Sequence, residues 1–416
     1  MSKNKRSISV INLEASSSDS LTSQNSKKVR LTPSNHAQTC DDSACKGCDV
    51  GEVEIVFTNE EGQEVELSPN ELLQLALEES SKEPLREHGI AKRLFDMSLE
   101  GFDKLITLEE QKIEVETVKS KEKEVRYRFA TKKTRYQYAC CCVAFGIYLP
   151  IIEHLRKGIE IYKQIIIEDD GYYDAWIGLG RARIHLAKIE REMSRNDQND
   201  LSDSENSKEE QESSIEIEQA SFNMAIDAFD KGLSILKSKD EKKYVIKSIL
   251  IAKDLQEYVM SIDHLKFTAY TQKIFTKVIN YLQDIYDLDN IYLNEINFAQ
   301  GIHGCCLYYL AKLKTDHNDD ENEESKMFLN EAIEKLLKAN DPLEEDRFRE
   351  ILGQAYILKT IIESDEEQIM EAYEKGRECL KQAYKFDPDN ENLREQLETL
   401  GALSNDDDEE YLDDDD

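Results

Sequence analysis

The sequence contains few of the residues that interrupt helices. Among its 416 residues only 6 are proline and 16 are glycine. A chain built of short strands and tight turns needs more of both, because these residues supply the backbone angles of turns. The shortage excludes that architecture and favours long, uninterrupted helices. We therefore expect an all-α protein.

Long apolar runs and an excess of positive charge are also missing. No stretch of about 18 apolar residues is present, so no membrane-spanning helix is predicted. The first twenty residues lack the apolar centre of a secretory signal, so we expect an intracellular protein. The formal net charge of -34 argues against a basic face that contacts phosphates. Neither a membrane nor a nucleic acid is expected as a direct partner.

The sequence contains no nucleophile elbow, Walker loop, HExxH motif or kinase signature. GLGRAR (178–183) lies within a helical pattern and lacks the third glycine of a dinucleotide-binding loop. Three histidines in helical patterns, His154, His185 and His303, are assigned no role, because a catalytic base needs an oriented partner. We expect no enzyme activity and no cofactor.

The nine cysteines are odd in number and partly adjacent, which favours reduced, packed thiols over a disulfide framework. Near the N-terminus, His36, Cys40, Cys45 and Cys48 have the ligand types that hold zinc. A second CxxC pair does not follow, so free thiols in a polar segment are the favoured alternative. We assign no metal and keep these four residues as weak candidates.

Composition divides the chain into a leader, a helical part and a tail. Residues 1–66 are predicted to be mostly disordered, with a weak hairpin between VEIVF (53–57) and QEVEL (63–67). Residues 67–403 carry apolar side chains at helical spacing. Residues 404–416 form an acidic tail that is predicted to be disordered.

The helical part is predicted to begin with an N-cap at Ser68, followed by Pro69 and by Glu71 three residues after the cap. Acidic loops are predicted to interrupt it near 195–214 and 315–325, where almost nothing can be buried. Aromatic residues between 270 and 309 are interpreted as core, with some tyrosines as alternative groove residues.

A period of 34 residues is present within the helical part. Gly146 and Gly180 are 34 residues apart, and Phe145 and Leu179 share this offset. Stacked helix pairs need small residues at a fixed period, where two helices cross closely. The only tryptophan, Trp176, falls within this pattern, and we interpret it as a packing residue.

This pattern resembles the tetratricopeptide repeat, which implies a superhelix of helix pairs with a concave, protein-binding groove. The matching positions are Phe145, Gly146, Trp176, Leu179 and Gly180 in first helices, Gly158, Tyr162 and Ile165 in a second helix, and Leu352, Gly353, Tyr356, Gly376, Leu380 and Ala383 near the C-terminus. Further second helices are predicted around Ala225, Phe229 and Gly232, and around Ala332, Leu336 and Ala339.

Basic residues gather in the leader of this acidic chain. The first 35 residues contain Lys3, Lys5, Arg6, Lys27, Lys28 and Arg30 against two acids. The stretches KNKR and KKVR are typical of a nuclear import signal. The alternative is a set of scattered surface charges.

The basic leader, the helical repeats with acidic insertions and the C-terminal FDPDN together resemble the fungal family of nuclear enhancers of translation termination. That family includes a negative regulator of a 2-oxoglutarate-dependent prolyl hydroxylase. The resemblance implies a non-catalytic adaptor, nuclear or shuttling to the cytoplasm, that acts by protein contact on translation termination or on a hydroxylase. The alternative is an acidic histone chaperone that shields a basic partner.

Overall fold

The computed structural model describes residues 26–31, 53–58, 63, 65–82, 89–116, 121–199, 207–262, 264, 267–286, 288, 293–315, 322–339 and 346–402. The chain divides into an N-terminal unit, Lys3–Gly232, and a C-terminal unit, Leu233–Asp416. The sequence predicted one helical part over 67–403, and the boundary between the two units lies within it.

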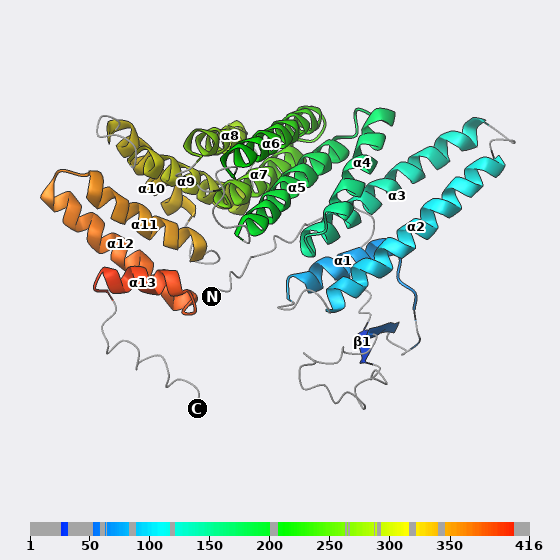
Figure 1. The fold of residues 1–416 in the computed structure, drawn as a ribbon, viewed down its shortest axis with the longest axis horizontal. Helices are drawn as coiled ribbons and strands as arrows, with labels where there is room; N and C mark the ends of the chain where they lie inside the picture. Colours follow the sequence, from blue (N-terminus) through cyan, green and yellow to red (C-terminus); the bar gives the residue numbers. More distant parts are fainter. Residues whose placement is uncertain are drawn as a thin grey trace. The chain divides into compact units, whose positions relative to one another are not determined.

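Helices make up nearly all of the described chain (Figure 1), which confirms the predicted all-α fold class. The N-terminal unit contains β1 (Ser26–Leu31), β2 (Val53–Thr58), α1 (Pro69–Ser80), α2 (Ile90–Glu116), α3 (Lys121–Tyr148), α4 (Ile152–Glu168), α5 (Tyr173–Asn199) and most of α6 (Ser207–Lys237). The C-terminal unit contains α7 (Glu241–Met260), α8 (Thr268–Tyr286), α9 (Leu293–Thr315), α10 (Asn322–Ala339), α11 (Asp346–Ile362), α12 (Glu366–Phe386) and α13 (Glu391–Thr399). Among the described helices, none has the length and apolar character needed to cross a membrane.

The first helix begins where its cap was predicted. The Ser68 hydroxyl accepts a hydrogen bond from Glu71 N–H at 3.3 Å, and Ser68 N–H donates to Glu71 Oε2 at 2.8 Å. Pro69 occupies the first helical turn, where the missing N–H costs nothing. This reciprocal capping box satisfies two backbone donors and fixes the start of the helical part.

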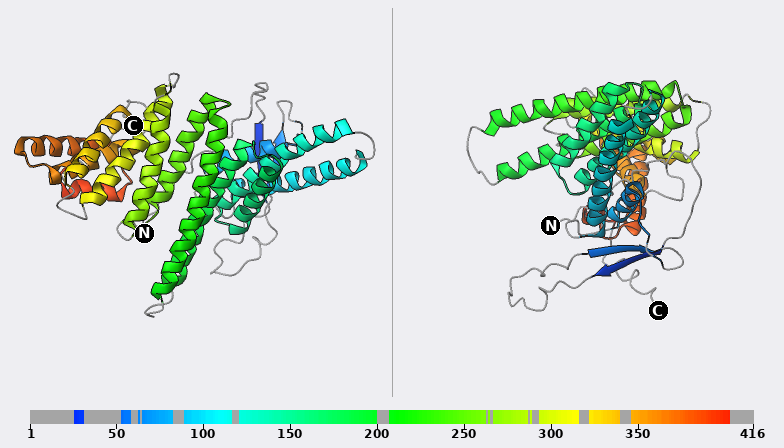
Figure 2. Two further views of the ribbon diagram at one scale, coloured as in Figure 1. Left: turned by 90° about the horizontal axis from the view of Figure 1, so that it is seen from above. Right: turned by 90° about the vertical axis from the view of Figure 1, so that its right-hand side faces the viewer.

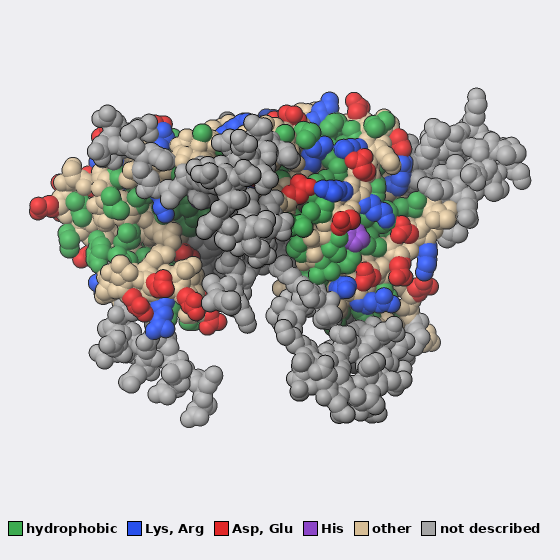
Figure 3. Space-filling model, in the orientation of Figure 1, with side chains coloured by type: hydrophobic (Ala, Val, Ile, Leu, Met, Phe, Trp, Pro, Cys, Tyr) green, Lys and Arg blue, Asp and Glu red, His purple; other side chains and the backbone are tan. Residues whose placement is uncertain are grey.

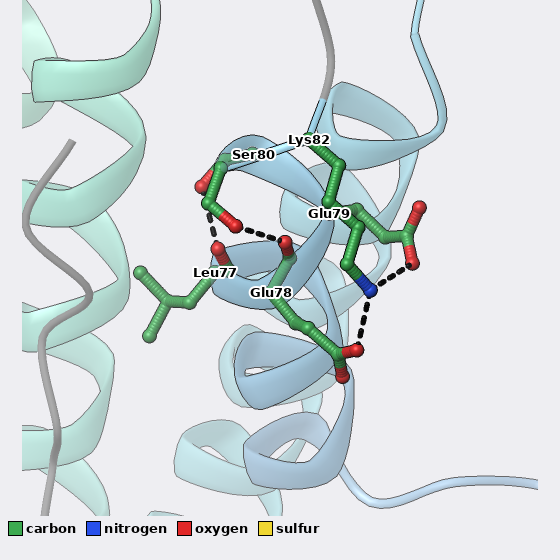
Figure 4. Close-up of polar contacts among 6 residues, drawn as sticks. Leu77, Glu78, Glu79, Ser80 and Lys82 are labelled. Carbon is green, nitrogen blue, oxygen red and sulfur yellow. Dashed lines mark hydrogen bonds and ion pairs between the residues drawn. The ribbon is translucent and has the colours of Figure 1, made fainter. Parts of the chain in front are cut away.

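The C-terminal end of α1 is closed by side chains (Figure 4). The Ser80 hydroxyl donates to the carbonyl of Leu77 at 2.8 Å. The Lys82 ammonium lies 2.6 Å from Glu78 Oε1, and it places a positive charge at the negative end of the helix dipole. Both ends of α1 are therefore satisfied locally.

The loops within the acidic stretches are shorter than predicted. Helix α5 continues to Asn199 and α6 begins at Ser207, so most of 195–214 is helical; α9 ends at Thr315 and α10 begins at Asn322. Figure 2 shows α5 and α6 extending beyond α3 and α4 of the same unit. Acidic residues are favourable in a first helical turn, because they compensate the dipole, and this lets helices start within acidic sequence.

The hairpin predicted in the leader has the wrong partner strand. Strand β2 pairs antiparallel with β1, which comes well before it in the sequence, and not with 63–67. One hydrogen bond reaches the predicted partner, from Val65 N–H to the Phe57 carbonyl at 2.9 Å. Ile55 and Phe57 are 9% and 7% exposed and pack with α1, α2 and α3. The helical core therefore holds β2 in place.

In the N-terminal unit, a glycine of one helix faces a backbone carbonyl of the next helix, or of its N-cap, at two places. A Cβ on Gly146 of α3 would lie 3.0 Å from the Ile151 carbonyl oxygen and 2.8 Å from Leu155 Cγ. A Cβ on Gly180 of α5 would lie 3.0 Å from the Ala225 carbonyl oxygen and 2.6 Å from the Phe229 ring. In both pairs the carbonyl and the side chain are four residues apart, so the two contacts follow the same pattern.

The C-terminal unit contains the same arrangement twice. A Cβ on Gly304 of α9 would lie 3.0 Å from the Ala332 carbonyl oxygen and 2.7 Å from Leu336 Cγ. A Cβ on Gly353 of α11 would lie 3.1 Å from the Gly376 carbonyl oxygen and 2.7 Å from Leu380 Cγ. The pairs α3/α4, α5/α6, α9/α10 and α11/α12 are thus built on one type of contact.

Second helices contribute reciprocal glycines in the N-terminal unit. A Cβ on Gly158 of α4 would lie 3.2 Å from the Ala139 carbonyl oxygen, and one on Gly232 of α6 would lie 3.2 Å from that of Tyr173. Ala139 and Tyr173 share the 34-residue offset, whereas Gly158 and Gly232 are more than twice as far apart in the sequence. The pair α5/α6 therefore repeats α3/α4 with a long addition between its contacts.

We predict that Gly180→Val lowers the free energy of unfolding of the N-terminal unit by about 1–3 kcal/mol, because the added atoms meet Phe229 and a carbonyl oxygen that belongs to the helix backbone. Urea denaturation followed by the fluorescence of Trp176, the only tryptophan and a residue of this unit, measures the change. Ala220→Val, at an exposed position of α6, is the control and costs less than about 1 kcal/mol. Equal midpoints for both variants contradict the close crossing.

Candidate protein-binding surface

Helices α3 and α5, the first members of neighbouring pairs, contact each other and present two aligned rows of half-buried residues. Equivalent positions of the rows are 34 residues apart, as for Cys140 and Asp174, or Ile147 and Arg181. We call the α3–α5 surface the set Tyr136, Cys140, Ile147, Tyr172, Asp174, Gly178 and Arg181. Apart from Tyr172, which precedes α5, these residues recur at helical spacing, so they lie along one side of each helix.

Three tyrosines from α3, α4 and the turn before α5 form the centre of this surface. The ring of Tyr136 lies 5.9 Å from that of Tyr162 and 5.5 Å from that of Tyr172, with tilted and edge-on geometry. The Tyr162 hydroxyl donates to Cys140 Sγ at 3.2 Å. Aromatic pairs at these separations add stabilisation beyond buried area, so the cluster is a rigid support.

Glycine at position 178 allows this cluster to form. A Cβ there would lie 2.6 Å from Cζ and 2.9 Å from the hydroxyl oxygen of Tyr162. Tyr162 is 2% exposed, and burial followed by the neighbouring Cys140 raises the pKa of its hydroxyl well above the ordinary value. The same two causes raise the pKa of Tyr136. Both phenols therefore stay neutral and keep their protons as hydrogen-bond donors.

Ion pairs join the start of the surface to α4. Arg135 donates two hydrogen bonds to the Glu168 carboxylate, at 2.8 and 2.6 Å. The Lys132 ammonium lies 3.0 Å from Asp169 Oδ2. A bidentate arginine pair fixes orientation better than a single contact, so α3 and the end of α4 are held in register.

The chemistry of the surface suits contact with a protein. Tyrosine and arginine are enriched among the residues that dominate binding energy at protein interfaces. Figure 3 shows hydrophobic side chains of the N-terminal unit interspersed with both Lys/Arg and Asp/Glu. In the part of the chain that the structure describes, no three His, Cys, Asp or Glu residues are grouped to hold a metal ion.

The repeat positions proposed from the sequence all lie within helices, and most are buried. Trp176 is half-buried, donates from Nε1 to the Asp170 carbonyl at 2.9 Å, and has its Cβ 3.1 Å from where a Cβ of Gly232 would be. Phe145 stacks on Phe95 at 5.2 Å. The remaining members are buried: Gly146, Gly158, Tyr162, Ile165, Leu179, Gly180, Leu352, Gly353, Tyr356, Gly376, Leu380 and Ala383. Their role as repeat-packing residues stays a prediction.

The candidates of the leader are placed only in part. His36, Cys40, Cys45 and Cys48 lie outside the described residues, as do Lys3, Lys5 and Arg6. Lys27, Lys28 and Arg30 lie in strand β1. The helical cysteines Cys141, Cys142, Cys305 and Cys306, which the sequence assigned to the core, are buried, whereas Cys140 and Cys379 are half-buried.

Sequence reasoning missed Gly304 and the role of Tyr136 and Tyr172. Gly304 and Ala332 are further apart in the sequence than Gly353 and Gly376, the equivalent residues of α11/α12, so a fixed period does not find Gly304. Its signal was the GIHG stretch, a helix with two closely spaced glycines. The tyrosine cluster was hidden because it gathers residues from three separate elements.

His303, which was assigned no role, lies in the interior of the C-terminal unit. Its side chain is 1% exposed and stacks on Tyr286 at 5.8 Å. Neither ring nitrogen has a hydrogen-bond partner within the described part of the chain. Burial, together with the nearby Lys335 ammonium, lowers the pKa of His303 to about 4. The imidazole is therefore neutral at physiological pH, which fits packing rather than proton transfer.

We predict that His303 makes the chain less stable as pH falls from about 6.5 to about 4. Below its ordinary pKa the unfolded state binds a proton, but the folded state does not until its own lower pKa, so stability of about 3 kcal/mol is lost in this window. Calorimetric melting of the full chain between pH 7.5 and 4, compared with His303→Phe, isolates this residue, because all other titrating groups are shared. Parallel curves for the two proteins contradict the prediction.

Comparison with known proteins gives partial similarities. Residues 317–403, which include α10, α11, α12 and α13, match the family model described as "Plant specific mitochondrial import receptor subunit TOM20". This segment is about a fifth of the chain, so it does not place the whole chain in that family. No curated protein matches the chain.

Similar solved structures include two crystal forms of the S. pombe nuclear import adaptor Nro1. They are 11% identical, cover 79% of this chain and 97% or 95% of their own, and have TM-scores of 0.47 and 0.44. A third, "The hypoxic regulator of sterol synthesis Nro1 is a nuclear import adaptor", is 12% identical, covers 79% and 97%, and has a TM-score of 0.43. At these TM-scores no residue role is transferred to this chain.

Proposed function

We propose that the chain is a non-catalytic adaptor built of tetratricopeptide-like helix pairs, and that a protein partner binds its α3–α5 surface. The observation that carries the proposal is the half-buried row of Tyr136, Cys140 and Ile147 next to that of Asp174 and Arg181, supported from beneath by buried Tyr162. Such a surface offers an aromatic and aliphatic centre with charged neighbours, the composition of a protein interface.

The support beneath the surface favours binding without large rearrangement. Tyr162 is held by Cys140 and by the closeness of Gly178, and the ion pairs of Arg135 and Lys132 hold α3 against α4. Side chains that are already ordered lose less conformational entropy when a partner binds. The residues named are therefore suited to act as anchors for a partner.

The finer proposal concerns the partner and the compartment. The resemblance to nuclear enhancers of translation termination suggests a partner in translation termination or a prolyl-hydroxylase-type enzyme. The basic stretches around Lys3 and Lys27 support a protein that works in the nucleus or shuttles to the cytoplasm. Neither a nucleic acid nor a membrane is proposed as a direct partner.

We predict that Ile147→Asp lowers recovery of the partner at least tenfold in affinity purification of the full chain with quantitative mass spectrometry. A carboxylate in the apolar part of an interface remains desolvated and unpaired, which costs several kcal/mol. Ile167→Asp is the matched control, because Ile167 is 84% exposed on α4 and does not belong to the α3–α5 surface.

The comparison requires that both variants fold. Trp176 fluorescence in urea verifies this, since the tryptophan belongs to the same unit. Equal recovery of every interacting protein with both folded variants refutes the assignment of the surface. Loss with Ile167→Asp alone assigns the partner to the exposed side of α4 instead.

The alternative function, an acidic histone chaperone, is supported by the distribution of charge. Stretches 195–214, 315–325 and 404–416 carry net charges of -5, -6 and -9, which together make -20 of the total of -34. Acid concentrated in this way attracts a basic protein at long range.

Salt separates the two functions. A partner held by acidic stretches loses at least tenfold in affinity between 0.05 and about 0.5 M salt, because exposed charges are screened beyond roughly one Debye length. A partner on the α3–α5 surface changes less, since its contacts are mainly apolar and aromatic. Titration of the purified full chain with a histone dimer and with the recovered partner, at both salt concentrations, gives the answer.

A further inference from the structure

The basic stretch SKKVRL of the leader forms strand β1, which is paired along its whole length with β2. In this register Lys27 stands opposite Phe57, Lys28 opposite Val56 and Arg30 opposite Glu54. The segment that the sequence marks as an import signal is therefore part of a ladder, not a free peptide.

The hydrogen-bond pattern shows which backbone groups of β1 are used. The Phe57 carbonyl accepts from Val65 N–H, so the polar groups of Phe57 point away from β1. The backbone N–H and C=O groups of successive residues in a strand point to opposite sides. Those of Glu54, Val56 and Thr58 therefore point toward β1. The residues opposite them in β1 are Arg30, Lys28 and Ser26. In an antiparallel ladder, such opposite residues exchange two backbone hydrogen bonds. The backbone of the basic stretch is thus occupied by β2.

Strand β2 has contacts beyond its pairing with β1. Strand β2 is anchored by Ile55 and Phe57 in the core formed with α1, α2 and α3. Strand β1 is bonded to β2 alone among the described strands. Because a two-stranded ribbon is only marginally stable in water, its pairing can open while β2 keeps the core contacts of Ile55 and Phe57.

A receptor that binds a lysine-rich peptide in extended form uses the backbone and the charges of that peptide together. We propose that β1 is a docking strand with two mutually exclusive partners, β2 within the free chain and an acidic, extended-peptide groove of an import receptor. Pairing with β2 then limits entry into the nucleus. This inference rests on the proposed nuclear function.

The first experiment measures accessibility of β1 in the purified full chain. Trypsin cleaves after lysine or arginine only in locally unpaired chain. Val56→Pro removes an N–H that points toward Lys28 and is expected to speed cleavage after residues 27, 28 or 30 at least fivefold, the factor for one net hydrogen bond of about 1 kcal/mol. Val56→Thr keeps this N–H and is expected to leave the rate unchanged. Equal rates for both variants overturn the pairing.

The second experiment measures nuclear accumulation of the labelled full chain in permeabilised cells. Val56→Pro is expected to enter at least twofold faster than the wild type, and the triple variant Lys27→Gln, Lys28→Gln, Arg30→Gln several-fold slower. If Val56→Pro opens β1 but enters at the wild-type rate, the mutual exclusion is wrong. If the triple variant enters like the wild type, the import role itself fails, whatever the state of the strands.

If Val56→Pro unfolds, an engineered disulfide between the two strands replaces it. Leu31 and Val53 stand opposite each other at a position where their backbones are not bonded, and Leu31→Cys with Val53→Cys joins the strands in oxidising buffer. The oxidised chain is expected to lose receptor-dependent entry and to regain it with dithiothreitol. Equal entry before and after reduction overturns the proposal.

Discussion

The close approach of a glycine in one helix to a backbone carbonyl of the next is the contact on which the helix pairs depend. It recurs at Gly146, Gly180, Gly304 and Gly353, each time with a carbonyl about 3 Å from the missing Cβ and a large side chain four residues further on. A backbone cannot move aside as a flexible side chain can, so this contact sets the distance between the helices. The side chains outside the crossing are then free to vary.

Because the crossing is local, the connection between its helices can change length. The pair α5/α6 keeps the contacts of α3/α4 although its contacting residues are further apart in the sequence, and much of the addition continues the two helices without altering the crossing. Longer connections cost little, since loop closure entropy grows only with the logarithm of length.

The sequence predicts those features that depend on one segment at a time. The cap at Ser68 and the glycines at 146, 180 and 353 could be found, because capping and periodic small residues are local patterns. Gly304 could not be found, because the sequence separation between it and its contact in the partner helix differs from that of Gly353. The pairing of β1 with β2 was missed as well, because it depends on where Ile55 and Phe57 find an apolar surface. The tyrosine cluster escaped for the same reason, as its members come from three elements.

Two glycines of α5 have different neighbours: one lies at the contact within a helix pair, and the other lies at the contact between two pairs. Gly180 faces α6, its partner in the pair, whereas Gly178 faces Tyr162 of α4, which belongs to the preceding pair. The tyrosine that fills the space between pairs is thus the one that supports Tyr136 and Cys140 from beneath. The α3–α5 surface therefore exists only when the pairs are stacked. The shape of this surface and the packing between the pairs therefore depend on the same side chain, that of Tyr162.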